Sequence, residues 1–374
     1  MNPIRKFQVT FFYITMVLFL AASGSAQDKP EQQPDLRIET IEARIPLRAW
    51  DAYGKRVTNL KPQDIVVIEN GEGRQVTSLK QEAANVLLVL DHSVEFGLMK
   101  NGRPRLQEES GGRNRLLTPP ATVDFAESLL PLLGEADHLA ILQYSDQVEL
   151  IQPWTTNRRE ALQALRAKVR QGDKTRLYDA LLRAAETLQQ RPAGRRVLIL
   201  VTDGIDTASQ TQKQAAITAL ARTGATLFIV SLAEFIKQPV ENTKPDIVSG
   251  HGGTPQDTAS ARVNINISPW VFKRNKELNK YTKKVAASAK EWTKIAENSG
   301  GEIYRPKNFD ELITLPIEIM REVGAQYTVT YLTERKPNEA VLRKLEILGA
   351  RSITVRAPQQ YYTGAQTPKE ESKK

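Results

Sequence analysis

The stretch VLLVLDHSVE, residues 86–95, joins an apolar run to a polar group that contains Asp91, Ser93 and Glu95. A second stretch, VLILVTDG at residues 197–204, repeats this arrangement and ends in Asp203 and Gly204. Runs that are apolar at every position are typical of central parallel strands covered by helices on both faces. We therefore predict two parallel strands with a carboxylate at the C-terminal end of each, where open α/β sheets bind ligands.

Strands and helices alternate through most of the chain around these two runs. Further strands are predicted over residues 138–144, 147–154, 226–232 and 302–304, and helices over 157–170, 177–189, 210–222, 274–298 and 308–322. Only Ser145 and Asp146 separate the strands at 138–144 and 147–154, which indicates a hairpin with an antiparallel second strand. The predicted fold class is α/β, a doubly wound, mainly parallel sheet with one antiparallel edge strand and small N- and C-terminal β segments.

Oxygen-bearing side chains follow the two central strands. Neighbouring strands lie about 4.8 Å apart, so Asp91 and Asp203 repel each other unless a cation lies between them. The hydroxyls of Ser93 and Thr175 complete an all-oxygen site, which suits a hard divalent cation such as Mg²⁺. The alternative is that both aspartates are helix caps or loop residues, because aspartate is common before helices.

This arrangement resembles the von Willebrand factor type A (VWFA) domain and its metal-ion-dependent adhesion site (MIDAS). In that family Asp-x-Ser-x-Ser follows the first strand, a threonine lies in a later loop, and an aspartate follows the fourth strand. The pattern maps here onto Asp91, Ser93, Glu95, Thr175 and Asp203, with Glu95 in place of the second serine. The stretches TRLYDAL at 175–181 and LVTDGIDT at 200–207 also read like this family.

The resemblance extends to the bacterial VWFA-related proteins that are common in Acidobacteria. In those proteins a short β segment precedes the domain, and a β tail ending in a Gly-Tyr-Tyr-like motif follows it. Together the match covers about residues 36–364. It implies a bound divalent ion, Mg²⁺ or alternatively Mn²⁺ or Ca²⁺, whose open coordination position is often filled by an acidic side chain of the partner.

Glu95 changes the charge of the implied site. With Asp91 and Asp203 it makes the site formally −3, so a divalent cation leaves −1 before a partner arrives. One hypothesis is that Glu95 competes for the open position, as an internal ligand or by repulsion, and disfavours acidic partners or favours Ca²⁺. The alternative is that Glu95 points to solvent and that the metal site is degenerate.

The N-terminus has the pattern of a secretory signal. Arg5 and Lys6 precede an apolar stretch from Phe11 to Ala22, and small residues at 24–26 precede Gln27. The apolar stretch is short for a membrane span, so cleavage is expected, with an uncleaved anchor as the alternative. The signal predicts an exported protein, periplasmic or extracellular, and no later segment is apolar enough to span a membrane.

The predicted organisation assigns every part of the chain to a segment. These are a signal peptide at 1–26, a linker at 27–35, a β segment at 36–84, a VWFA domain at 85–324 with insertions at about 97–118 and 235–270, a β tail at 325–364 and a disordered end at 365–374. The sequence does not decide whether the two β segments pack together, although each is too small to fold alone.

Composition and motifs limit the function. The chain has 374 residues, no cysteine and a formal net charge of +9, which removes disulfides and thiol chemistry. No nucleophile elbow, phosphate loop, dinucleotide fingerprint, zinc helix or nucleic-acid motif is present. We predict a non-enzymatic protein that binds a protein or envelope-surface ligand through the MIDAS. The alternative is a metal-free envelope scaffold, and the sequence does not set the ligand or the oligomeric state.

Overall fold

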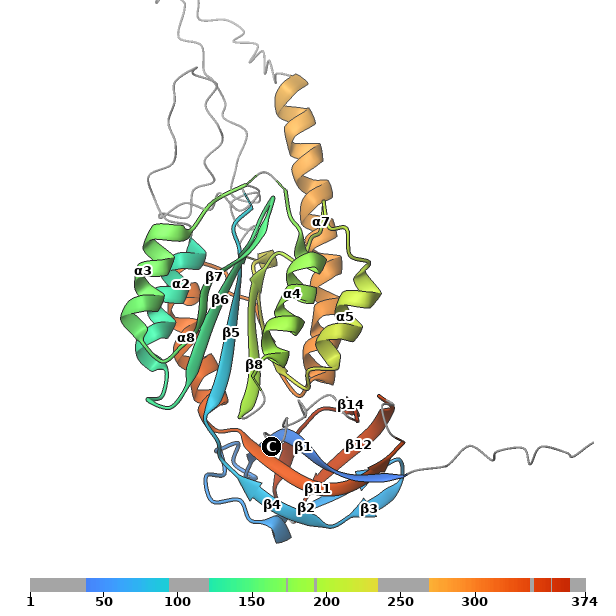
Figure 1. Ribbon diagram of the computed structural model, residues 1–374. Helices are drawn as coiled ribbons and strands as arrows, with labels where there is room; N and C mark the ends of the chain where they lie inside the picture. The colour runs from blue at the N-terminus through green and yellow to red at the C-terminus, as the bar shows by residue number, and fades with distance from the viewer. Residues whose placement is uncertain are drawn as a thin grey trace, which may run out of the picture.

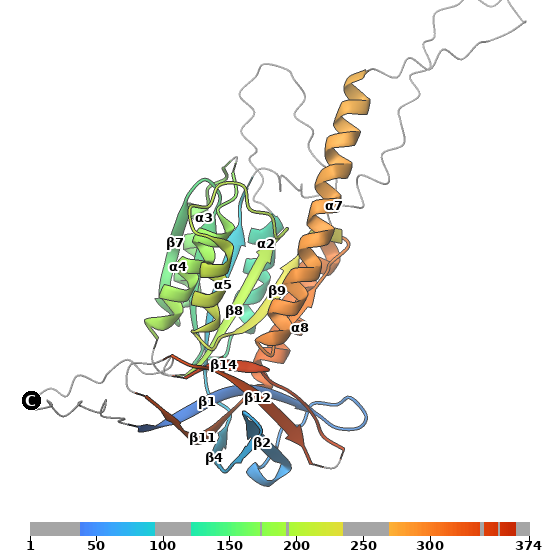
Figure 2. The same ribbon diagram turned by 90° about the vertical axis from the view of Figure 1, so that its right-hand side faces the viewer.

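The computed structural model describes residues 38–93, 121–172, 174–191, 194–234, 269–336, 340–350 and 352–363. These residues form a parallel-sheet domain that lies on a β-sandwich (Figures 1 and 2). The predicted signal peptide, linker, insertion at 97–118 and C-terminal end lie outside the described residues, as does Glu95. All but the last two residues of the insertion predicted at about 235–270 lie outside them as well.

The parallel-sheet domain has the predicted α/β fold. Its strands are β5 (Ala84–Asp91), β6 (His138–Tyr144), β7 (Val148–Thr155), β8 (Arg195–Thr202), β9 (Thr226–Ser231) and β10 (Glu302–Tyr304). Their spatial order is β10-β9-β8-β5-β6-β7. Only the β6–β7 pair is antiparallel in this sheet, so the predicted hairpin with an antiparallel edge strand is confirmed.

Helices cover both faces of this sheet. They are α2 (Ala121–Leu129), α3 (Arg158–Lys168), α4 (Leu177–Gln189), α5 (Lys213–Ala221), α7 (Pro269–Asn298) and α8 (Phe309–Gly324). Val86, Leu88 and Leu90 of β5 pack with α2, α3 and α8, whereas Leu87 and Val89 pack with α4, α5 and α7. Successive side chains of a strand point to opposite faces, so a strand buried on both faces must be apolar throughout.

The N- and C-terminal β segments fold together into one sandwich. Its strands are β1 (Glu39–Trp50), β2 (Ile65–Glu69), β3 (Glu72–Arg74), β4 (Val76–Lys80), β11 (Tyr327–Arg335), β12 (Leu342–Gly349), β13 (Thr354–Arg356) and β14 (Gln360–Tyr362). The sheet orders are β13-β1-β11-β4 and β14-β12-β2-β3, so each sheet mixes strands from both segments. This pairing answers a question that the sequence left open, because the two halves share one apolar core.

A buried carboxylate ties the last strand to the sandwich. Glu69 has no exposed surface, and it accepts hydrogen bonds from the hydroxyls of Tyr361, Thr333 and Tyr331 and from Arg74. Because Tyr331 and Thr333 lie on β11, Tyr361 lies on β14 and Arg74 ends β3, one side chain links β2 to β3, β11 and β14.

The sandwich and the parallel-sheet domain are joined through Arg48 of β1. Its guanidinium donates to Glu322 of α8 at 2.7 Å and to the Gly300 carbonyl at 2.8 Å, and it lies over the Phe228 ring at 5.2 Å. Arg48 is 1% exposed, so these contacts replace its hydration. Arg56 also pairs with Glu322, which makes the buried carboxylate a shared anchor.

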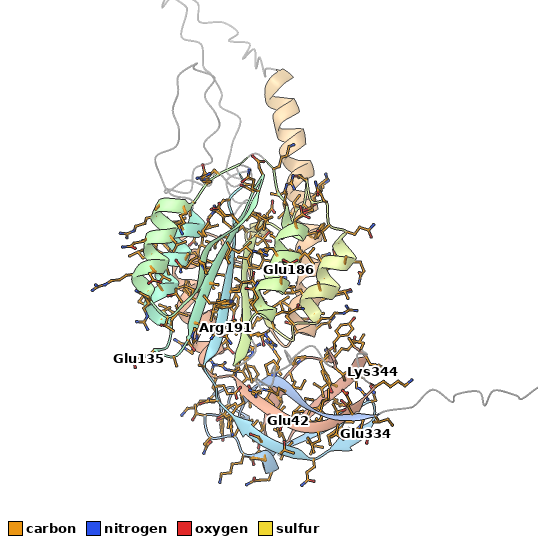
Figure 3. The ribbon with its side chains drawn as sticks, in the orientation of Figure 1. Glu42, Glu135, Glu186, Arg191, Glu334 and Lys344 are labelled. Carbon is orange, nitrogen blue, oxygen red and sulfur yellow. The ribbon has the colours of Figure 1, made fainter. Side chains whose placement is uncertain are left out.

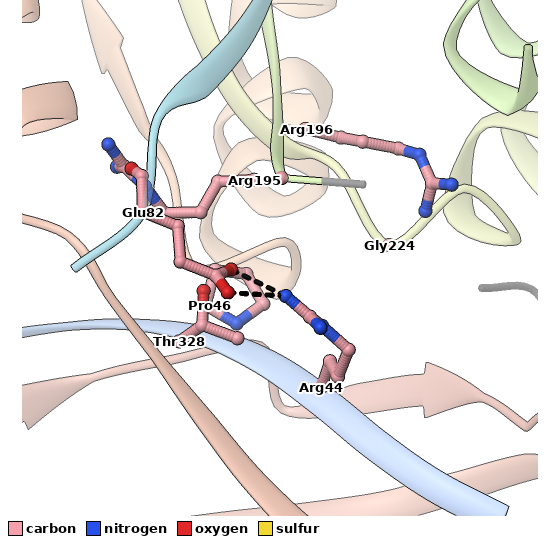
Figure 4. A pocket seen from close by; sticks show the side chains of 8 residues that line it. Arg44, Pro46, Glu82, Arg195, Arg196, Gly224 and Thr328 are labelled. Carbon is pink, nitrogen blue, oxygen red and sulfur yellow. Dashed lines mark hydrogen bonds and ion pairs between the residues drawn. The ribbon is translucent and has the colours of Figure 1, made fainter. Parts of the chain in front are cut away.

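Beside this contact lies a small cavity of about 30 Å³ lined by Arg44, Pro46, Glu82 and Arg195, among others (Figure 4). Arg44 bridges Glu82 there at 2.6 Å. A volume of this size has room for about one water molecule, so it is not a ligand site.

In the part of the chain that the structure describes, no helix is long and apolar enough to cross a membrane.

Replacement of Arg48 by methionine is expected to lower the free energy of unfolding by about 3 kcal/mol, because Glu322 then stays buried with a single partner. Urea unfolding measures the change. Arg183→Met is the matched control, since Arg183 makes an exposed pair with Glu186 on α4 (Figure 3). Equal stability of the two variants would contradict the assigned role of Arg48.

Candidate metal centre

Asp91 is the last residue of β5 and its carboxylate is fully buried. Oδ1 accepts hydrogen bonds from the Ser93 backbone N–H at 3.0 Å and from the Ser93 hydroxyl at 2.8 Å. A hydroxyl that donates its proton to a carboxylate keeps its lone pairs for a cation. Asp91 therefore prepares Ser93 as a neutral oxygen ligand.

Tyr144 holds the other oxygen of Asp91. The Tyr144 hydroxyl lies 2.8 Å from Asp91 Oδ2 and 2.8 Å from Thr202 Oγ1, and thereby links β6, β5 and β8. Burial raises the pKa of Tyr144 well above its usual value, and the negative charges of Asp91 and Asp203 raise it further. The phenol therefore keeps its proton as a donor to Asp91.

The turn after β8 carries Asp203, which is 1% exposed. Its Oδ1 accepts from the Ile205 N–H at 2.8 Å, and the next residue, Gly204, has a φ of +78°. The Gly204 carbonyl accepts from Ser288 Oγ at 2.5 Å and Trp292 Nε1 at 3.3 Å, both on α7. Helix α7 thus fixes the backbone beside Asp203.

Thr175 comes from the loop before α4 and is fully buried. Its Oγ1 lies 3.0 Å from Thr207 Oγ1, and its carbonyl accepts from the N–H groups of Thr207 and Ala208. The same loop meets the end of β5, because Gly172 N–H donates to the His92 carbonyl at 3.3 Å and Ser93 bridges Gly172. The loop of Thr175 therefore touches both the Ser93 and the Asp203 segments.

Asp179 and Asp206 hold these loops together. Asp206 binds the Ser209 hydroxyl, and Ser209 Oγ accepts from the first N–H groups of α4 at 3.0 and 3.1 Å. Asp179 accepts from Thr211 N–H at 2.8 Å. Burial raises the pKa of Asp179, but the hydrogen bonds from Thr211 and Gln210 outweigh it, and the net pKa is lowered. Asp206 therefore stabilises its own loop, and Asp179, at the start of α4, also binds the loop that contains Gln210 and Thr211.

His92 takes no part in the oxygen cluster. Its Nδ1 lies 3.0 Å from Gln143 Oε1, and burial lowers its pKa to about 4, so the ring is neutral at pH 7. A neutral ring adds no charge beside Asp91.

The donor set fits a hard divalent cation. Asp91, Ser93, Thr175 and Asp203, the predicted ligands that the structure describes, end on adjoining segments and offer only oxygen atoms. Glu95 lies outside the described residues. Within the described ranges no group of three or more His, Cys, Asp or Glu side chains lies together in a way that could hold a metal ion. Tyr144, Ser288 and Trp292 are contributors that the sequence reading missed.

Residues 111–261 match the family model of the von Willebrand factor type A (VWA) domain. Over this range, which is less than half of the chain, the sequence matches a VWA domain. The matched range is narrower than the predicted 85–324, and it includes Thr175 and Asp203 but not Asp91. VWA domains commonly mediate protein binding or adhesion, are generally non-enzymatic and often bind a divalent metal at a MIDAS. No curated protein matches the chain.

Solved structures that resemble the chain include a von Willebrand factor type A protein from Catenulispora acidiphila, with 11% identity and a TM-score of 0.41, covering 88% of this chain and 74% of that one. BatB from Bacteroides thetaiotaomicron has 16% identity and a TM-score of 0.36, with coverage of 64% and 97%. Proximal thread matrix protein 1 from the mussel byssus, with a zinc-occupied MIDAS motif, has 13% identity and a TM-score of 0.37. That match covers 65% of this chain and 48% of the mussel chain, about half its length.

Gly204 gives a direct test of the contact between the turn of Asp203 and α7. A Cβ at Gly204 would lie 2.6 Å from Ser288 Oγ and Trp292, so Gly204→Ala is expected to cost backbone strain plus overpacking, about 3 kcal/mol or more. Gly71→Ala is the matched control, because Gly71 has a φ of +88° but nothing within 4 Å of its Cβ position. The control should lose about 1 kcal/mol in urea unfolding. Similar losses for the two variants would rule out the tight contact with α7.

Proposed function

We propose that this protein is an exported, non-enzymatic binding or adhesion protein that recognises a protein or surface ligand through a MIDAS at the C-terminal edge of its parallel sheet. The proposed ligands are Asp91, Ser93, Glu95, Thr175 and Asp203. The observation that supports this most strongly is the joint burial of two carboxylates and two hydroxyls on adjoining segments. Charges buried this way are held by partners or cations.

The chain's own residues prepare this site for a metal and a partner. Ser93 and Tyr144 donate hydrogen bonds to the two oxygens of Asp91 and so fix the orientation of this carboxylate. The contacts between Thr175 and Thr207 set the distance between two of the contributing loops. A bound divalent cation would neutralise the two carboxylates and offer an open coordination position to the partner.

The finer parts of the proposal rest on the sequence. The charged and apolar pattern of residues 1–26 supports export to the periplasm or the medium. The β segments on either side of the domain support membership of the bacterial VWFA-related group. Mg²⁺ is the proposed ion because the described donors are all oxygen atoms, with Mn²⁺ and Ca²⁺ as alternatives.

A metal-free envelope scaffold is the second candidate, and one observation favours it. Both oxygens of Asp91 already accept hydrogen bonds from the protein, so this carboxylate is satisfied without an ion. In that case the cluster would stabilise the loops, and binding would be insensitive to chelators.

Thermal unfolding in chelator, followed by titration with Mg²⁺, Mn²⁺ and Ca²⁺, separates the two candidates. A metal that binds only the folded state adds about 2.7 kcal/mol at one hundred times its Kd, and so raises the Tm by about 5 to 10 °C for a domain of this size. Asp203→Asn should abolish the shift. Asp310→Asn, an exposed carboxylate at the start of α8, should retain it.

Absence of any Tm shift at millimolar metal would support the scaffold instead. A shift that persists in Asp203→Asn would place the metal elsewhere in the chain.

The role of Glu95 is tested separately. Glu95→Ser removes one negative charge and restores the serine of the family pattern. The variant, loaded with metal, should therefore bind a probe peptide with an aspartate side chain about tenfold more tightly, as measured by calorimetry. In the control titration the acidic residue of the peptide is replaced by lysine, and Glu95→Ser should then give no increase in affinity. Unchanged affinity for the acidic peptide would refute the competition hypothesis.

A further inference from the structure

Helix α7 carries a row of lysines on the side opposite its packed face. Lys283, Lys290 and Lys294 are exposed, whereas the face packed on the sheet consists of Val285, Ala289, Trp292 and Ala296. At 100° per residue the three lysines fall on one side of the helix, nearly opposite the buried side. Over eleven residues they span about 16 Å along the helix axis. We call these three residues the lysine row.

The lysine row makes no ion pair with the part of the chain that the structure describes. Among the described residues none of its ammonium groups has a carboxylate partner, although nearby Lys213 pairs with Glu291 of the same helix. Lys290 and Lys294 are four residues apart, a spacing at which like charges destabilise a helix. Glu291 and Glu297 lie three residues from Lys294 and can favour it in the helix, whereas Lys283 and Lys290 have no acidic residue at these spacings, so helix stability does not explain those two lysines.

The pattern continues along the sequence of α7. Lys276 and Lys280 occupy positions of the helix backbone that repeat the spacing of the row, and the first turn contains no acidic residue. Positive charge toward the N-terminus of a helix opposes the helix dipole. The N-terminal half of α7 projects beyond the C-terminal edge of the sheet (Figures 1 and 2).

We propose that the lysine row binds a linear anionic polysaccharide that lies along α7. Charge complementarity supports an anionic partner, and a single file of point charges about 6 to 10 Å apart fits a polymer with regularly repeated acidic groups. This binding uses no residue of the candidate metal centre, so it is independent of the function proposed above.

Two other anionic partners fit the row less well. An anionic membrane binds helices that also present large apolar side chains beside the basic ones, but the exposed neighbours here include Ala286 and Ala287. Nucleic-acid recognition favours arginine, whose planar group binds phosphate with two hydrogen bonds, and the row contains only lysine. A polysaccharide read by point charges requires neither feature.

The test is calorimetric titration of the whole protein with polygalacturonate, with neutral dextran as the control polymer. Replacement of the three lysines of the row by glutamine should weaken binding about tenfold or more, because each charge contributes to the attraction. The matched control replaces Lys55, Lys61 and Lys344, three exposed lysines of the sandwich (Lys344 in Figure 3), and changes the net charge equally. Binding of the control should stay within about twofold of the parent protein and should weaken as salt is raised.

Chelator and Asp203→Asn should leave polygalacturonate binding unchanged, which separates this proposal from the metal-dependent function. Equal losses in the two triple variants would overturn the proposal, since only net charge would then matter. Absence of polygalacturonate binding would overturn it as well. Tighter, row-dependent binding to vesicles of an anionic lipid or to duplex DNA would replace the polysaccharide with that partner.

Discussion

The arrangement of the parallel-sheet domain depends on the pairing of β5 with β8. These strands are parallel and in register from Ala84 opposite Arg195 to Leu90 opposite Val201, and helices bury both of their faces. Polar side chains are costly along such strands, so they collect where the strands end. Because parallel strands end at the same edge, Asp91 and the turn of Asp203 are placed side by side at a switch point of the sheet, where the connections from β5 and β8 diverge.

Two carboxylates at one buried edge create an electrostatic problem that the surrounding residues partly solve. Ser93 and Tyr144 donate to Asp91, and backbone N–H groups turn toward Asp203 and Asp179. Each donor lowers the cost of a buried charge without removing the repulsion between the carboxylates. The remaining repulsion is what gives a divalent cation its affinity for such a site, and it explains why a third acid at Glu95 would matter for the partner's charge.

The parts of the fold that follow from local pattern were visible in the sequence. The apolar runs before Asp91 and Asp203, the hairpin at Ser145 and the stripes of the helices depend on neighbours a few residues apart. The pairing of β1 with β11 joins Glu39 to Arg335, and no periodicity encodes a contact of that range. Buried Arg48 was missed for the same reason, because its partners Glu322 and Gly300 lie more than 250 positions away. Tyr144 ends an ordinary apolar strand, and its role depends on the proximity of Thr202 and Asp91, which only the folded sheet provides.

Helix α7 connects the two ends of the parallel-sheet domain. Near its middle, Ser288 and Trp292 hold the Gly204 carbonyl beside the candidate metal centre. At its C-terminal end the Asn298 carbonyl accepts from Gln359 of the sandwich, and the Gly300 carbonyl accepts from Arg48. The sandwich therefore fixes the register of α7 along the sheet, and this register places Ser288 and Trp292 against the turn of Asp203. The lysine row lies along this held half, on the side of the helix opposite Val285, Ala289 and Trp292, so the same packing that supports the candidate metal centre also presents the row to solvent.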